Sequence, residues 1–281
     1  MLLHAPAKLN LGLYLGRARA DGLHELCSLF EPLALADLIR IEEGERDEVI
    51  CAGVEGENLA ARALAALRER GWDHAPLRIE IEKRTPVAAG LGGGSADAAA
   101  VLRLAAGGGM VADLPAIAAE LGADVPSQLR PALALVRGAG ERVEPLPAPA
   151  EHTALLLPGG GGLSTEAVFD EADRLGLGRT DAALVGIAAE LRAAAGAGAS
   201  PLAYAELLVN DLEPAARNLR PDIGDALDAL HAAGAPAVFL SGSGPTAVGL
   251  FPTLSEAEAV ASSLNRTDAI VCLAPPPRAI R

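Results

Sequence analysis

Alternating apolar and polar positions predict several β-strands along this chain. The segment Lys8–Leu15 begins with this alternation and ends apolar, whereas Asp37–Glu42 and Leu77–Glu82 alternate throughout. Successive side chains of a strand point to opposite faces of a sheet, so a period of two indicates strands with one face buried. Further strands are expected at residues 153–157, 237–240 and 247–251.

Apolar residues at helical spacing predict helices between these strands. Asn58–Arg70 has this spacing, with Asn58 as the N-cap and Gly71 as the end. A second helix is expected from Ser95 to Ala106, ended by the glycines 107–109. Helices at 222–233 and 255–264 flank the last two strands, and the Ala/Gly-rich segment 193–200 is interpreted as a flexible loop.

The order of these elements predicts an α+β fold in two domains. Strands and helices are segregated, which favours two-layer packing over a doubly wound parallel sheet. Three prolines fall within Pro145–Pro149, where we expect the joint between domains. This joint divides the chain into an N-terminal domain, residues 1–148, and a C-terminal domain, residues 149–281.

Composition and charge exclude several classes of partner. The chain is 51% hydrophobic but only 2% aromatic, so Ala, Leu and Val must build its core. Its net charge of −14, with no basic stripe, disfavours nucleic acid and anionic membranes as partners. Cys27, Cys51 and Cys272 form no close pair, which argues against disulfides and zinc. With no signal peptide and no long apolar run, we expect a cytoplasmic protein.

The glycine-rich segment VAAGLGGGSAD, residues 87–97, is a candidate anion site. Its glycines let a ligand approach the peptide amides, and Ser95 is expected to cap a helix with Asp97 in the first turn. Free amides at such a helix end bind phosphates. The segment lacks the lysine of a Walker loop and the spacing of the dinucleotide fingerprint. A simple strand-to-helix turn therefore stays open as the alternative.

Three other segments carry polar groups in suggestive positions. Lys8 and Asn10 lie two residues apart on one face of a predicted strand, although a strand lysine is more often a solvated edge residue. Asp124 lies between a helix end and Pro126, as a turn aspartate also would. The segment Leu240–Thr246 joins two apolar strands through free amides and hydroxyls, as a hairpin loop also would.

Together these segments resemble the GHMP family of small-molecule kinases. The resemblance lies in PAKLN near the start, in the residues from Pro86 to Ser95, and in SGSGP near the end. Within that family, the segments ADGLHEL (20–26), LGADVP (121–126) and NDLEP (210–214) resemble the 4-diphosphocytidyl-2-C-methyl-D-erythritol kinases.

The resemblance implies a fold and an activity. Each of two domains would be a mostly antiparallel sheet packed with helices, with the active site in the cleft between them. The implied reaction transfers the γ-phosphate of ATP to the 2-hydroxyl of a cytidine diphosphate-linked methylerythritol, in a non-mevalonate isoprenoid route. Asp124 would be the general base, Lys8 would stabilise the charged groups, and Mg²⁺ would be held partly by Ser95. The ATP-binding residues would be Val87, Ala88, Ala89, Gly90, Leu91, Gly92, Gly93, Gly94, Ser95, Ala96 and Asp97.

The resemblance also assigns the substrate contacts. His24 would hydrogen-bond the cytosine base and Phe169 would stack on it, while Leu23 stands where the family has a stacking tyrosine. Asn10 would contact the polyol. Gly242, Ser243 and Gly244 would close the site from the C-terminal domain. The partner is then a small molecule, and the chain is expected to be a monomer or a homodimer.

Two alternatives remain at this point. The chain resembles other GHMP kinases as well, which act on homoserine, sugars or mevalonate, and Leu23 favours this alternative. A non-catalytic nucleotide-binding protein on the same scaffold is the second alternative. The presence of Lys8, Asp124 and the glycine-rich segment together argues against it, because a binding protein needs no general base.

Overall fold

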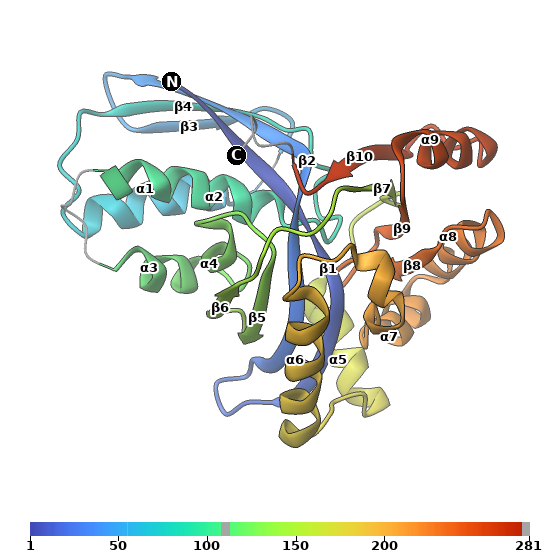
Figure 1. Ribbon diagram of the computed structural model, residues 1–281. Coiled ribbons are helices and arrows are strands. Elements are labelled where there is room, and N and C mark those ends of the chain that lie inside the picture. Colours follow the sequence, from blue (N-terminus) through green and yellow to red (C-terminus); the bar gives the residue numbers. More distant parts are fainter. Residues whose placement is uncertain (55, 108–112, 277–281) are drawn as a thin grey trace.

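A long hairpin organises the first of two β-sheets in the computed structural model, which describes residues 1–54, 56–107 and 113–276 (Figure 1). β2 pairs with β1 along one edge, and with β4 and β5 along the other. β3 pairs with β4 in parallel and β6 with β5 antiparallel. The strands of this sheet are β1 (Leu2–Ala18), β2 (His24–Glu43), β3 (Glu48–Cys51), β4 (Leu77–Glu82), β5 (Ala134–Gly138) and β6 (Arg142–Pro145).

The second sheet is entirely antiparallel, in the order β10-β7-β9-β8. α8 packs on β8 and β9, and α9 packs on β7, β9 and β10. The strands are β7 (His152–Leu157), β8 (Ala237–Leu240), β9 (Ala247–Phe251) and β10 (Ile270–Ala274). The expected α+β fold, with two mostly antiparallel sheets packed with helices, is confirmed.

Helices pack on both sheets, and one helix from the second half of the chain packs on the first sheet. α1 and α2 pack on each other, and α6 packs on β1, β2 and β5, although it follows the second sheet's first strand (Figure 1). The helices are α1 (Leu59–Glu69), α2 (Gly93–Leu104), α3 (Leu114–Leu121), α4 (Val125–Gln128), α5 (Thr165–Leu175), α6 (Asp181–Ala195), α7 (Glu213–Leu219), α8 (Pro221–Ala232) and α9 (Leu254–Ser263), with 3₁₀ turns at Ala105–Gly107 and Pro201–Leu207. No helix in the described part of the chain has the length and apolar character needed to cross a membrane.

Most predicted elements are confirmed, and two differences have a physical reason. The predicted loop 193–200 is wrong at its start, because α6 continues to Ala195, whose side chain is fully buried in the core. The second predicted helix begins at Gly93 rather than at Ser95, because Gly92 takes a left-handed conformation and is the N-cap. Of the glycines expected to end it, Gly108 and Gly109 lie outside the described residues. The domain boundary at residues 148 and 149 stays a prediction.

A buried Glu–His pair joins the two sheets. Glu31 of β2 and His152 of β7 are both fully buried, and His152 Nε2 lies 3.1 Å from Glu31 Oε2. Burial lowers the pKa of His152, but the Glu31 carboxylate outweighs it and raises that pKa above its usual value. The pair therefore favours a charged histidine inside the protein, supported by the Glu31 carboxylate and by the Ala150 carbonyl, 3.0 Å from His152 Nδ1.

Two buried carboxylates share one ammonium group beneath α2. Lys83, just after β4, contacts Asp37 of β2 and lies 2.8 Å from Asp97 of α2. Asp37 also accepts hydrogen bonds from the backbone amides of Arg84 and Thr85, at 2.6 and 2.7 Å. Burial raises the pKa of Asp97 to about 7, although Lys83 opposes this shift. The cluster ties the first turns of α2 to the sheet.

We predict that His152→Leu destabilises the fold and that a second substitution restores it. The single variant leaves the Glu31 carboxylate buried without a partner, which costs about 3 kcal/mol or more. The double variant Glu31→Leu/His152→Leu removes both charges and should recover most of that loss. Urea-induced unfolding followed by circular dichroism measures both, with the exposed His231→Leu as a control. A double variant no more stable than the single one would contradict this role of the pair.

We predict that Asp97→Asn removes a pH-dependent loss of stability. The folded protein holds the Asp97 proton more tightly than the unfolded chain, since the pKa of Asp97 is raised from 3.8 to about 7. The free energy of unfolding of the wild type must therefore fall, relative to that of the variant, as the pH rises from 3.8 to about 7. The free energy of unfolding of the variant minus that of the wild type should be larger at pH 8 than at pH 5, by about 1 kcal/mol or more. Urea titrations at both pH values check this, with the exposed Asp113→Asn as the matched control; an unchanged difference would contradict it.

Candidate active site

A cleft of about 1140 Å³ brings together residues from distant parts of the chain. Its walls come from β1, the glycine-rich segment 86–97, the residues before α4, the first turns of α5, and the loop between β8 and β9. The predicted site residues fall almost entirely on this cleft. Of those residues, Ala96 and Gly244 alone do not line it: Ala96 is fully buried, and Gly244 faces Leu240 and Ile223 in the core.

The N-terminus of α2 opens into the cleft without a side-chain cap. The N-cap Gly92 has a left-handed backbone (φ 67°) and, as a glycine, makes no side-chain capping hydrogen bond. The sequence predicts Ser95 as the cap of this helix, and this prediction is wrong, because Ser95 lies in the first turn. Asp97 is not in the first turn; it lies deeper, against Lys83. An uncapped twelve-residue helix presents amides and the positive end of its dipole to an anion.

The two glycine-rich loops press against each other. A side chain at Gly90 would place its Cβ 2.4 Å from the carbonyl oxygen of Ser241, so only glycine fits there. Two hydroxyl groups join the loops: Ser241 Oγ donates to the Gly90 carbonyl at 3.1 Å, and Thr246 Oγ1 donates to the Ala89 carbonyl at 2.6 Å. The glycine-rich segment is therefore held from both halves of the chain.

Asn210 holds the second of these loops. Its Nδ2 donates to the carbonyl oxygens of Leu240 and Gly242, each at 2.7 Å, and its Oδ1 accepts from the Leu212 amide at 2.9 Å. Both polar atoms of the Asn210 side chain are thus used on the backbone, in three hydrogen bonds. This arrangement fixes the position of Gly242 and Ser243 at the cleft wall.

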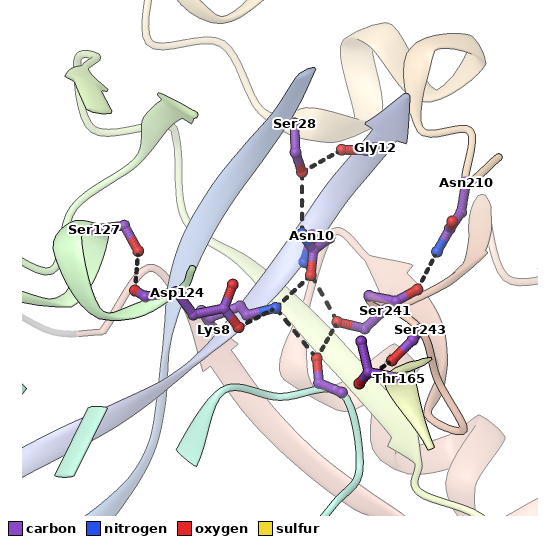
Figure 2. A network of polar contacts seen from close by, with 12 residues as sticks. Lys8, Asn10, Gly12, Ser28, Asp124, Ser127, Thr165, Asn210, Ser241 and Ser243 are labelled. Atoms are coloured by element: carbon purple, nitrogen blue, oxygen red, sulfur yellow. Dashed lines mark hydrogen bonds and ion pairs between the residues drawn. The ribbon is translucent and has the colours of Figure 1, made fainter. Parts of the chain in front are cut away.

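Lys8 and Asp124 both line the cleft, and their side chains meet (Figure 2). Lys8 Nζ lies 3.2 Å from Asp124 Oδ2 and donates to the side-chain oxygen of Asn10 and, at 3.4 Å, to the Gly90 carbonyl. The ammonium also lies 4.8 Å from the centre of the Phe30 ring. Lys8 is only 4% exposed, whereas 29% of the Asp124 side chain is accessible. The carboxylate can thus receive a proton from a bound molecule.

His24, Phe169 and Leu23 all line the cleft. His24 Nε2 lies 2.9 Å from Asp173 Oδ1, and the rings of His24 and Phe169 are 5.0 Å apart and tilted by 49°. Leu23 is 54% exposed at the tip of the β1–β2 hairpin. Together these three residues offer an aromatic face, an apolar side chain and an oriented imidazole to a planar group.

Four residues of this region were not predicted from the sequence: Ser28, Asp37, Lys83 and Asp173. Three of them act through contacts between segments far apart in the chain, which no local pattern reveals. Asp173 did carry a signal, because it lies four residues after Phe169 and so on the same face of α5. That spacing alone would have placed a carboxylate beside the predicted stacking residue.

Family models and curated relatives match this chain. Residues 58–129 match the model for the GHMP kinases N terminal domain, and residues 179–269 match GHMP kinases C terminal. The 4-diphosphocytidyl-2-C-methyl-D-erythritol kinase of Thermobifida fusca is 41% identical, covering 92% of this chain and 90% of the relative. The enzyme of the same name from Streptomyces avermitilis is 39% identical with the same coverage.

Solved structures of kinases also match this chain. A crystal structure of 4-(cytidine 5'-diphospho)-2C-methyl-D-erythritol kinase matches with a TM-score of 0.80 and 36% identity, over 98% of this chain and 99% of the other. Homoserine kinase from Cytophaga hutchinsonii matches with a TM-score of 0.69 over 98% and 94% of the two chains, but at 18% identity it shares the fold alone. The chain belongs to the GHMP kinases and, within them, to the family of the 4-diphosphocytidyl-2-C-methyl-D-erythritol kinases.

Proposed function

We propose that this kinase transfers the γ-phosphate of ATP to the 2-hydroxyl of 4-diphosphocytidyl-2-C-methyl-D-erythritol. The observation that carries the proposal is the contact of 3.2 Å between Lys8 Nζ and Asp124 Oδ2, in the same cleft as the uncapped N-terminus of α2. A buried cation, an accessible carboxylate and a helix end are the parts that phosphoryl transfer to an alcohol requires.

In this proposal Asp124 acts as the general base. Its accessible oxygen accepts the proton of the 2-hydroxyl while the hydroxyl oxygen bonds to the γ-phosphorus. The bond from that phosphorus to its bridging oxygen breaks, and ADP leaves. Lys8 holds Asp124 and adds positive charge near the transferred group, and the amides of residues 93–95 bind the phosphates.

Magnesium bound with ATP would neutralise phosphate charge during transfer. Ser95, which lines the cleft in the first turn of α2, is the residue that we assign as a ligand. The described residues contain no group of three His, Cys, Asp or Glu side chains that could hold a metal ion.

The cytosine end is proposed to bind between Phe169, Leu23 and His24. Asn10 and the loop carrying Gly242, Ser243 and Gly244 would complete the substrate site, although Asn10 already bonds Lys8 and Ser28, and Gly244 lies behind the cleft wall. Leu23 favours a second candidate, a GHMP kinase for an alcohol without a base, because leucine offers no aromatic face.

We also infer that the protein is a monomer or a homodimer and that it lies in the cytoplasm.

We predict that Asp124→Asn lowers kcat at least about 1000-fold, because the amide cannot accept the proton. Release of ADP, measured in a coupled assay with ATP, magnesium and the cytidylated substrate, gives the rate. ATP affinity, measured by calorimetry, should stay within about twofold. Asp113→Asn, an exposed aspartate that caps α3, is the control and should keep full activity. A normal rate for Asp124→Asn would eliminate the assigned base.

We predict that Leu23→Tyr lowers KM for the cytidylated substrate about five-fold and leaves kcat unchanged. An aromatic ring at this exposed position would add a stacking face, worth about 1 kcal/mol. Leu254→Tyr, at a comparably exposed position, is the matched control. If the wild type instead prefers homoserine, mevalonate or a sugar in the same assay, the second candidate replaces the first.

A further inference from the structure

We propose that Ser28 is a positioning residue that sets the direction of the Lys8 ammonium through the side-chain amide of Asn10. This inference rests on the proposed function, because it assigns Lys8 a part in phosphate transfer. Ser28 lies on β2 next to β1, is fully buried, and does not line the cleft. Any influence it has on the reaction must therefore pass through a neighbour.

The hydrogen bonds of Ser28 leave Asn10 only one orientation. Ser28 Oγ donates its single proton to the Gly12 carbonyl at 2.6 Å. The hydroxyl can then only accept, and it accepts from Asn10 Nδ2 at 3.1 Å (Figure 2). The amide nitrogen of Asn10 must point to Ser28, so its oxygen must point to Lys8. A reversed amide would set the Asn10 Nδ2 donor against the Lys8 ammonium, and the Asn10 oxygen against a Ser28 hydroxyl whose only proton is already donated to Gly12.

A β-bulge makes the Gly12 carbonyl available. Asn10 pairs with Phe30 and Leu13 pairs with Ser28, so β1 has one more residue than β2 between these pairs. Such a bulge interrupts the ladder and frees a backbone group from strand pairing. Gly12 has a φ of 137°, and a Cβ there would lie 2.8 Å from the Leu207 carbonyl oxygen, so glycine is required at this point.

The orientation matters because the Lys8 ammonium has three acceptors for its three protons. They are Asn10 Oδ1, Asp124 Oδ2 and the carbonyl oxygen of Gly90, and each comes from a different segment. Loss of the Asn10 acceptor would leave the buried ammonium free to move from its place beside Asp124. Small displacements of catalytic groups reduce rates strongly.

The first test is the Ser28→Ala variant. We expect kcat to fall about 10- to 100-fold, with KM for ATP within twofold, because the phosphate-binding amides are untouched. Ser28→Thr keeps the hydroxyl and should recover most of the rate. Cys27→Ala is the matched control, since the neighbouring side chain is equally buried but points to the opposite face of β2. Unchanged kcat in Ser28→Ala would overturn the proposal.

A double-mutant cycle separates positioning from a general structural effect. In an Asn10→Leu background, Ser28→Ala should cause no further loss of kcat, because the amide through which it acts is gone. Additive losses would overturn the proposal. If Asn10→Leu does not fold, Asn10→Ala takes its place in the cycle, with circular dichroism confirming the fold of each variant.

A readout without turnover distinguishes this proposal from the proposed function. The NH₃⁺ signal of Lys8 in ¹⁵N-detected NMR should be visible in the wild type, where the group is buried and fully bonded, and should shift or broaden in Ser28→Ala. A signal unchanged in Ser28→Ala would overturn the positioning role. If the signal responds while the wild type phosphorylates no cytidylated substrate, the proposed function fails and the positioning of Lys8 by Ser28 stands.

Discussion

A buried ammonium group is the constraint around which this candidate active site is built. Lys8 is only 4% exposed, and burying a charge is costly unless every proton finds an acceptor. The acceptors come from β1 itself, from the glycine-rich segment and from the residue before α4. The requirements of one cation therefore bring three distant segments to one point, and the same contacts place the accessible carboxylate of Asp124 beside α2.

The second constraint is the close approach of the two glycine-rich loops. Gly90 meets the Ser241 carbonyl at a distance that excludes any side chain, and hydroxyl groups of Ser241 and Thr246 bind carbonyl oxygens across the contact. These hydroxyls take up backbone carbonyls, so the loop keeps its amides for a ligand. Asn210 fixes the other loop in the same way, through its carbonyl oxygens. On the proposed function, amides held in place in this way form a preorganised site for phosphate.

Local patterns predicted the elements well, and their limits are physical. The strands at 77–82, 237–240 and 247–251 have the predicted bounds. Alternation marks the first as half-buried, whereas the other two are short apolar runs, as expected for strands buried on both faces. The N-terminus of α2 was misplaced, because the left-handed Gly92 is the N-cap, three residues before the serine that propensity favours. The contact of Lys8 with Asp124 followed from family resemblance and not from any pattern. Ser28 depends on a bulge and a hydrogen-bond direction, which appear only in three dimensions.

Charge in the cleft decides how a phosphorylated ligand can be held there. The described cationic side chains that line the cleft are two lysines, and both already contact carboxylates. Six carboxylate side chains line the same cleft: Glu57, Asp97, Asp124, Glu166, Asp170 and Asp173. ATP and a cytidine diphosphate are both polyanions, so side-chain charge alone would repel them. On the proposed function, affinity must come from the amides of α2 and from divalent cations that enter with the phosphates, which makes the uncapped helix end the indispensable part of the site.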